Sequence, residues 1–275
     1  MCTAGRVIKT ISTYAVVCVT SVDDELFALL QRNYTQVAVY SINDYRLLRR
    51  IRWPGLEPFL GINVMTSCVR HKCLYASDYD NRCIHRYDLS SSTVSKWSVP
   101  GKPCCLSVTP GSCNLLVGFW GYYVWKHREP SKLVELRADS GQVVREIRLQ
   151  SDIELLHHAV QLTTGQYVVC HSLLNPRHRV CMVDDKGRVT RSYGGQGGSG
   201  VGQLAVTRHL AVDEDSQYIF VADCLNHRVV LLCPKLELVG EFRNGVSDPW
   251  RLYFHQTTQR LFVGQQVGGV DVIQL

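Results

Sequence analysis

Short apolar segments rich in Val, Ile, Leu and Tyr recur along the whole chain, and clusters of Gly, Pro, Asn, Asp and Ser separate them. This pattern is typical of β-strands divided by turns. No segment carries a convincing apolar stripe for a helix of three turns, and the apolar segment 26–30 is short enough to be a buried strand. The chain is therefore predicted to be all-β.

One strand recurs six times, beginning at positions 37, 84, 133, 180, 229 and 270, so the repeats are 41 to 49 residues apart. In the first five repeats a further strand follows about ten residues later. The six copies are Val37–Tyr40, Ile84–Tyr87, Leu133–Leu136, Val180–Val183, Val229–Leu232 and Val270–Ile273. A period of about 40–50 residues with four strands per unit is typical of β-propeller blades.

The sixth repeat has no following strand, because the chain ends at Leu275. A matching segment, Val7–Ile11, lies at the other end of the chain. We expect this N-terminal strand to complete the last blade, since a closed ring leaves no open sheet edge. The prediction is a single six-bladed propeller over residues 1–275, with the strand near 7–11 completing the blade that ends at 275.

The fifth repeat carries a specific motif. It reads Gly200-Val-Gly202-Gln203-Leu204, then His209-Leu-Ala-Val-Asp213, then Tyr218-Ile-Phe-Val-Ala-Asp223-Cys-Leu-Asn226-His227-Arg228-Val229. This sequence resembles the NHL repeat. The fourth repeat keeps His178-Arg179-Val180 and Tyr193-Gly194-Gly195, and the second keeps Ser77-Asp78-Tyr-Asp-Asn81-Arg82. The other three repeats match mainly by their period, so the motif itself covers about a third of the chain.

The resemblance implies an NHL-type propeller similar to the one at the C-terminus of tripartite-motif ubiquitin ligases. In that family the propeller recruits substrate proteins or binds single-stranded or structured RNA. The RING, B-box and coiled-coil segments of those ligases have no counterpart here: the chain has no RING-type Cys/His spacing and no heptad run. We therefore expect a non-enzymatic recognition scaffold whose partner is a protein or an RNA. Any ubiquitin-ligase role would need a segment that this chain does not contain.

In such propellers the loops between second and third strands share one face with the connections between blades. We call this the interblade face. It is the usual ligand face of these folds, which is an argument from fold analogy. Aromatic rings can stack on bases or fill pockets of a protein, and cations can pair with phosphates or carboxylates. The candidate ligand-binding residues expected there are Tyr34, Tyr79, Arg82, Trp120, Tyr122, Lys126, Arg177, His178 and His227.

Each of these features also has a structural interpretation. Several of the aromatic rings can equally pack inward, although the irregular insertion at 119–131 is the strongest candidate for a specific binding feature. Asp223 and Arg228 are expected to form a structural pair that holds a turn, in preference to a ligand contact. The segment Gly194–Gly202 resembles a phosphate loop, but it lacks Gly-Lys-Ser/Thr and a following helix. A flexible connection between blades is the favoured interpretation.

A metal-dependent propeller enzyme of the lyase or lactonase type is the alternative function. His157, His209 and Arg251 fall at one position of their inner strands by residue count, and all three are expected to face the central channel, with His255 pointing elsewhere. Zinc usually needs three or four protein ligands, and two histidines and an arginine do not supply them. No Gly-x-Ser-x-Gly, His-Glu-x-x-His or calcium-loop motif is present. The sequence predicts no catalytic residue, no metal site and no cofactor.

Composition changes this picture little. The formal charge of +6 permits an acidic partner without requiring one. Most of the 12 cysteines lie in apolar segments, and no Cys-x-x-Cys occurs. Buried free thiols in a reducing compartment are therefore the favoured interpretation, and a cytoplasmic location is expected. No stretch reaches about 18 consecutive apolar residues. The isolated propeller is expected to be monomeric, without a membrane partner.

Overall fold

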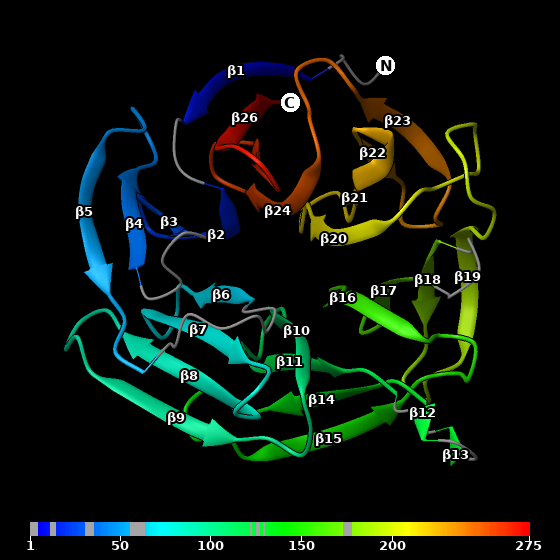
Figure 1. Ribbon diagram of the computed structural model, residues 1–275, viewed down its shortest axis with the longest axis horizontal. Helices are drawn as coiled ribbons and strands as arrows, with labels where there is room; N and C mark the ends of the chain where they lie inside the picture. The colour runs from blue at the N-terminus through cyan, green and yellow to red at the C-terminus, as the bar shows by residue number, and fades with distance from the viewer. Residues whose placement is uncertain are drawn as a thin grey trace.

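Six four-stranded antiparallel sheets form a ring in the computed structural model (Figure 1). The structure describes residues 5–11, 15–30, 36–55, 64–121, 123–124, 127–128, 130–172 and 178–275, without the side chains of 123–124 and 127–128. The prediction of an all-β, six-bladed propeller is thereby confirmed. Among the described residues the only helical segment is one 3₁₀ turn, and no helix is long and apolar enough to cross a membrane.

The first strand of each blade lies nearest the centre of the ring, and the fourth lies at the rim (Figure 1). Blade 1 contains β2 (Val16–Val22), β3 (Glu25–Leu30), β4 (Gln36–Ser41) and β5 (Leu47–Arg52). Blade 2 contains β6 (Met65–Cys68), β7 (Cys73–Asp78), β8 (Cys83–Asp88) and β9 (Val94–Ser98). Blade 3 contains β10 (Pro103–Val108), β11 (Leu115–Phe119), β14 (Lys132–Leu136) and β15 (Val143–Arg148). A short hairpin of β12 (Tyr123–Val124) and β13 (His127–Arg128) is inserted in blade 3.

The remaining blades repeat this order. Blade 4 contains β16 (Leu155–Gln161), β17 (Tyr167–Ser172), β18 (Arg179–Val183) and β19 (Val189–Gly194). Blade 5 contains β20 (Thr207–Val212), β21 (Ile219–Asp223), the 3₁₀ turn η2 (Cys224–Asn226), β22 (Arg228–Leu232) and β23 (Leu238–Phe242). Blade 6 contains β24 (Pro249–His255), β25 (Arg260–Gln265), β26 (Val270–Gln274) and β1 (Arg6–Ile11).

The N-terminal strand closes the ring as expected. β1 pairs antiparallel with β26 from Arg6 opposite Gln274 to Ile11 opposite Val270. The Thr10 hydroxyl also donates a hydrogen bond of 2.7 Å to the Asp271 carboxylate. The first and last parts of the described chain thus share one sheet, which covers the outer edge of β26.

The apolar pattern of each strand follows its place in the blade. β3 and β7 are buried on both faces, because each lies inside its sheet and between neighbouring blades. The outer strands β5 and β15 are mostly exposed and carry several charges, which discourages pairing with another chain. The segment 26–30 is a buried strand, as its length indicated.

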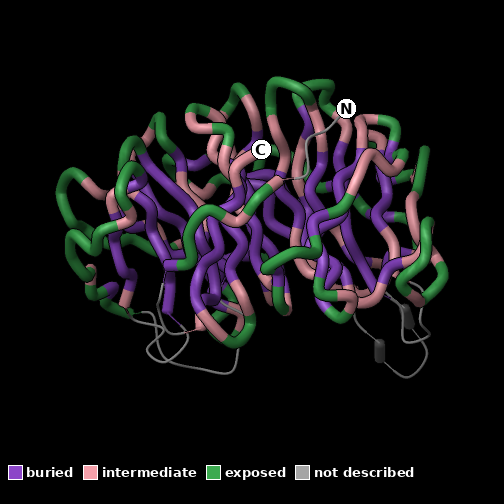
Figure 2. The backbone as a smooth tube through the Cα atoms, turned by 90° about the horizontal axis from the view of Figure 1, so that it is seen from above, coloured by how far each residue is buried: buried purple, intermediate pink, exposed green. Residues whose placement is uncertain are grey.

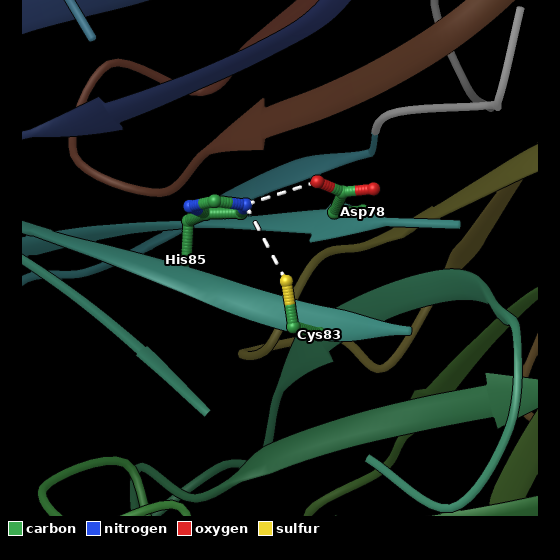
Figure 3. Close-up of side chains that lie close together, drawn as sticks. All are labelled: Asp78, Cys83 and His85. Carbon is green, nitrogen blue, oxygen red and sulfur yellow. Dashed lines mark hydrogen bonds and ion pairs between the residues drawn. The ribbon is translucent and has the colours of Figure 1, made fainter. Parts of the chain in front are cut away.

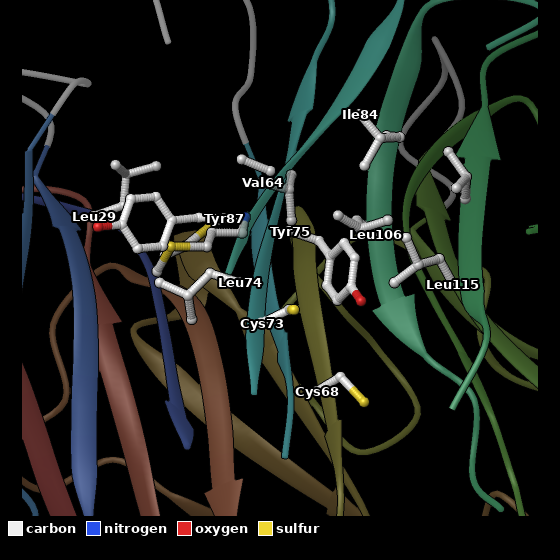
Figure 4. Packing of buried hydrophobic residues seen from close by; sticks show 14 of the residues in the cluster. Leu29, Val64, Cys68, Cys73, Leu74, Tyr75, Ile84, Tyr87, Leu106 and Leu115 are labelled. Carbon is white, nitrogen blue, oxygen red and sulfur yellow. Dashed lines mark hydrogen bonds between the residues drawn. The ribbon is translucent and has the colours of Figure 1, made fainter. Parts of the chain in front are cut away.

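The core consists of layers between adjacent blades. In Figure 4, Leu29 of blade 1 approaches Leu74 and Tyr87 of blade 2, and Tyr75 of blade 2 approaches Leu106 and Leu115 of blade 3. The Tyr75 hydroxyl is satisfied by a 2.9 Å hydrogen bond to the Ala138 carbonyl. The eleven described cysteines are free thiols, nine of them buried. Figure 2 shows buried backbone through the middle of the ring and exposed backbone at its two faces.

Candidate functional site

The interblade face carries the ends of the second strands and the beginnings of the inner strands. Tyr79 follows β7, and Trp120 follows β11. Their rings meet edge-on, with centroids 5.4 Å apart, and the Lys102 ammonium lies 4.6 Å from the Tyr79 centroid. All three side chains are half-buried. The structure therefore brings two of the predicted ligand residues together and adds a lysine that the sequence interpretation overlooked.

Trp120 is also part of the framework. Its indole Nε1 donates a hydrogen bond of 2.5 Å to the Leu156 carbonyl in blade 4, and its ring packs beside the apolar layer between blades 3 and 4. The inward-packing interpretation therefore holds for part of this ring, and a ligand-binding role for Trp120 stays a prediction.

A second aromatic–cation cluster lies on the same face at blades 5 and 6, where β20 and β24 begin. The Arg208 guanidinium lies 4.3 Å from the Trp250 ring centroid, which is a favourable stacking distance. The Nε atom of Arg208 is buried with no hydrogen-bond partner in the described part of the chain. Neither residue was among the predicted ligand residues. The Trp–Arg pairing depends on two adjacent blades, so no local sequence signal marks it.

Three other predicted residues are placed individually. Arg82 is exposed in the β7–β8 turn at a positive φ of 51°. His178 and His157 both hydrogen-bond the Ser172 hydroxyl at 2.9 Å. His227 is exposed after η2, and its Nδ1 lies 3.1 Å from the Asp248 carboxylate. Tyr34, Tyr122, Lys126 and Arg177 lie outside the described residues.

Asp223 and Arg228 form the structural pair that was expected. The Arg228 Nε donates to Asp223 Oδ2 at 2.7 Å, and both side chains are almost fully buried. The remaining Arg228 nitrogens donate to the carbonyls of Ser199 and Gln203 and to the Glu241 carboxylate. The glycine-rich segment 194–202 is thus a connection between blades 4 and 5 that is held by Arg228.

The central channel holds a histidine pair different from the expected one. His158, not His157, corresponds to His209: their rings stack with centroids 3.6 Å apart. Each accepts an equivalent hydrogen bond from the next blade, His158 from Leu210 N and His209 from Leu252 N. The residue count was therefore wrong by one: the equivalent hydrogen bonds from Leu210 N and Leu252 N identify His158 and His209 as corresponding residues.

The channel is a cavity of about 970 Å³ whose lining includes His158, His209 and His255. The His255 Nδ1 atom lies 2.8 Å from the Thr258 hydroxyl, at the end of β24. Burial, with a contribution from the Arg251 cation, lowers the pKa of His158 to about 3, so this imidazole is neutral near pH 7. Arg251 is itself buried and lies over the Trp250 ring. A cation beside two stacked imidazoles disfavours a metal ion at this position.

The described residues that best fit a metal lie in blade 2 instead. Asp78, Cys83 and His85 are buried at the end of the β7–β8 hairpin, with ligand atoms all within 4.8 Å of one another (Figure 3). His85 Nε2 lies 3.1 Å from Asp78 Oδ2 and 3.5 Å from Cys83 Sγ. Burial opposes ionisation of Asp78, but hydrogen bonds from Asn81 and His85 outweigh it and hold the pKa of this carboxyl below its usual value.

Comparisons with known proteins identify the architecture only. No known protein family and no curated protein matches the chain. Among solved structures, the chain is similar to the β-propeller domain of Cps50 (Swd1) from Myceliophteria thermophila, with a TM-score of 0.67 and 11% identity. The match covers 98% of this chain and 99% of that one. A likeness at this identity shows the fold, and by its strand order the chain is a six-bladed β-propeller.

Proposed function

We propose that the chain is a non-enzymatic recognition propeller that binds a protein partner through its interblade face. The observation that carries this proposal is a set of three exposed apolar side chains on connections of the interblade face around blades 5 and 6. Val201, Leu225 and Val267 are 85%, 62% and 78% exposed. Single exposed apolar residues are common, whereas several on connected segments of one face favour an interaction surface.

Backbone and side-chain hydrogen bonds connect the segments that carry these three side chains. Leu225 N donates to the Ala205 carbonyl, and Asn226 Nδ2 donates to the Gly198 carbonyl, so η2 lies against the connection that carries Val201. Asp248 N donates to His227 Nδ1, and Gln266 N donates to the Asp248 carbonyl. The apolar tips are therefore fixed in position before a partner arrives, which lowers the ordering cost of binding.

The two aromatic–cation clusters extend the same surface. Tyr, Trp and Arg dominate the binding energy of protein interfaces, and the face presents Tyr79 with Trp120 and Trp250 with Arg208. Lys102 and Arg82 add positive charge near the first cluster. A partner that combines apolar side chains with carboxylates fits this arrangement best.

The resemblance of the fifth repeat to the NHL motif makes this proposal more specific. It suggests a substrate-recruiting module like the propeller of tripartite-motif ubiquitin ligases, acting in the cytoplasm. The free thiols are compatible with a reducing compartment. In that arrangement the catalytic step belongs to another segment or subunit, and this chain supplies only recognition.

Affinity capture with matched variants tests the proposal. The bait is the full chain, compared with a Leu225→Asp/Val267→Asp double variant and with Val69→Asp, which alters an exposed valine in the β6–β7 turn on the opposite face. Proteins retained by the wild type and by Val69→Asp should fall by about tenfold or more with the double variant, which is about 1.4 kcal/mol of binding. A captured protein that the double variant retains equally would refute this surface.

Single-stranded RNA is the second candidate, and the pairing of Tyr79 and Trp120 with Lys102 is the observation that favours it. Fluorescence anisotropy with a random RNA pool at two salt concentrations distinguishes it. Low-micromolar binding that falls steeply with salt and is lost in Arg82→Glu/Lys102→Glu supports RNA. If the chain binds no RNA at either salt concentration, the RNA candidate is rejected and the protein partner remains.

A further inference from the structure

We propose that Asp78, Cys83 and His85 form a binding site for a zinc-type divalent cation, with Asp78 Oδ2, Cys83 Sγ and His85 Nε2 as its three protein ligands. One carboxylate, one thiolate and one imidazole are ligands that Zn²⁺ accepts, and water completes a four-coordinate site. The three residues lie on the two strands of one hairpin, so the backbone pairing that sets their spacing does not depend on the ion.

The distances agree with a tetrahedral site. Zinc–sulfur and zinc–nitrogen bonds of about 2.3 and 2.0–2.1 Å place a nitrogen and a sulfur ligand about 3.6 Å apart, and a nitrogen and an oxygen ligand about 3.4 Å apart. The corresponding separations here are 3.5 Å from His85 Nε2 to Cys83 Sγ and 3.1 Å from His85 Nε2 to Asp78 Oδ2. The third separation, between the ligand atoms of Cys83 and Asp78, is within 4.8 Å, so these two side chains have to approach each other to enclose an ion.

The three potential ligand atoms gather within 4.8 Å of one another. A single imidazole nitrogen, His85 Nε2, faces both Asp78 and Cys83 (Figure 3). An Nε2–H group can donate to Asp78, and the Cys83 thiol beside it is only a weak donor or acceptor. A cation among the three atoms is attractive to all of them.

Blade 5 shows which charge accompanies the buried aspartate at the end of the second strand. Asp223 occupies the position of Asp78, and the strand pairing sets Arg228 opposite it as Cys83 is set opposite Asp78. The buried Asp223 carboxylate is paired with the Arg228 guanidinium. In blade 2 the arginine is replaced by Cys83, so the buried Asp78 has lost that cation. A dication with one carboxylate and one thiolate gives a neutral buried complex, which avoids the cost of an uncompensated charge.

Proton release should accompany binding. A cysteine thiol has an ordinary pKa of about 8.5, so it is mostly protonated near pH 7 in the absence of a metal ion. A metal ion binds the thiolate and displaces this proton, and its affinity therefore falls as the pH is lowered. The bound ion would fix the hairpin that presents Tyr79 and Arg82 to the interblade face.

The site can be tested on the chelator-stripped full chain with Co²⁺ and Zn²⁺. We expect one equivalent of Co²⁺ to produce a thiolate-to-cobalt charge-transfer band that Zn²⁺ abolishes. Cys83→Ser and Asp78→Asn should lose the band. Cys181→Ser should keep it, because this cysteine lies beside His171 in blade 4, where Arg179 already occupies the arginine position. Circular dichroism and thermal unfolding verify that each variant is folded.

X-ray absorption of the zinc-loaded wild type provides a measurement that needs no variant. The proposed ligand set predicts one sulfur at about 2.3 Å and two or three nitrogen or oxygen ligands at about 2.0–2.2 Å. No metal uptake by the folded, stripped chain would overturn the proposal. So would a zinc shell with two or more sulfurs, or a cobalt band that persists in Cys83→Ser.

Discussion

Blades 2 and 5 contain equivalent hairpins between their second and third strands, each with a buried aspartate at the same position. The side chains that contact this aspartate differ between the two blades. In blade 5, Asp223 ends the second strand and faces Arg228 at the start of the third. The guanidinium reaches the carboxylate, two carbonyls of the preceding connection and Glu241. A single cation thereby fixes the turn, the outer strand and the link from blade 4.

In blade 2 the same position holds Cys83, and the side chain that contacts the carboxylate lies two residues along the strand, at His85. Side chains alternate along a strand, so residues 83 and 85 lie on the same face and both reach Asp78. The polar contacts among Asp78, Asn81, Cys83 and His85 stay within one hairpin. The propeller repeat therefore preserves a buried carboxylate in both blades, whereas its counter-charge differs.

The largest effect on stability should follow from removing the buried carboxylate charge of Asp223 in blade 5. Asp223→Asn leaves Arg228 buried and cationic. It also places the amide of the new side chain among donors that point at the carboxylate in the wild type. We expect the free energy of unfolding to fall by about 3 kcal/mol, as measured by urea titration at pH 7.

An exposed acid provides the control for that measurement. Asp44 lies 3.9 Å from Arg46 in a turn where both side chains are mostly exposed. Asp44→Asn should change the free energy of unfolding by less than about 0.5 kcal/mol, because exposed pairs contribute little. Equal effects of the two substitutions would show that Asp223–Arg228 is not the pair that holds blade 5.

The next largest effect on stability should come from the titration of His158, which lies outside both hairpins. The pKa of His158 is lowered to about 3 in the folded protein, while that of an unfolded histidine is about 6.5. The unfolded chain then binds more protons below pH 6.5, so stability falls as the pH falls through this window. At pH 5 this one residue should account for a loss of about 2 kcal/mol. His158→Gln should lose correspondingly less stability than the wild type between pH 7 and 5, and equal losses would contradict the assignment.

The architecture could be predicted from sequence because it depends on local pattern. A strand every 41 to 49 residues, and an N-terminal segment that matches the missing last strand, determine the ring and its closure. The register within a strand was harder to predict. Counting residues aligned His157 with His209, whereas the hydrogen bonds from Leu210 N and Leu252 N show that His158 is the equivalent residue. Both inner strands contain a register shift, and a bulge has no clear composition signal, so a count along the chain does not identify the equivalent position.

The candidate sites were harder to predict than the fold, because they depend on contacts that no known motif or single repeat describes. Known metal motifs place several ligands at fixed spacings, and Asp78, Cys83 and His85 match none of them. The available signal was the second repeat itself, in which cysteine replaces the motif arginine and a histidine follows two residues later. The contact between Trp250 and Arg208 joins two blades, so it depends on a distance that no single repeat encodes.

Asp78→Asn in blade 2 should lower the free energy of unfolding less than Asp223→Asn does in blade 5. In the metal-free protein, Asp78→Asn leaves no buried guanidinium behind, because the residue opposite Asp78 is Cys83 and not an arginine. The cost then approaches that of a weakened buried hydrogen-bond network, about 1–2 kcal/mol. Urea titration of the two asparagine variants side by side measures the difference, and a loss of about 3 kcal/mol for both would contradict the expectation of a milder effect in blade 2.

The smallest effect on stability should come from the tips of the interblade face in blade 5. Leu225 projects from η2 and is mostly exposed, although the turn beneath it is anchored by the Leu225 and Asn226 hydrogen bonds. Leu225→Asp removes little buried area, so the free energy of unfolding should change by less than about 0.5 kcal/mol. Partner binding should nevertheless weaken, since a charge replaces an apolar contact at the surface. A variant that loses stability but binds normally would place Leu225 in the framework of blade 5 and the recognition surface elsewhere.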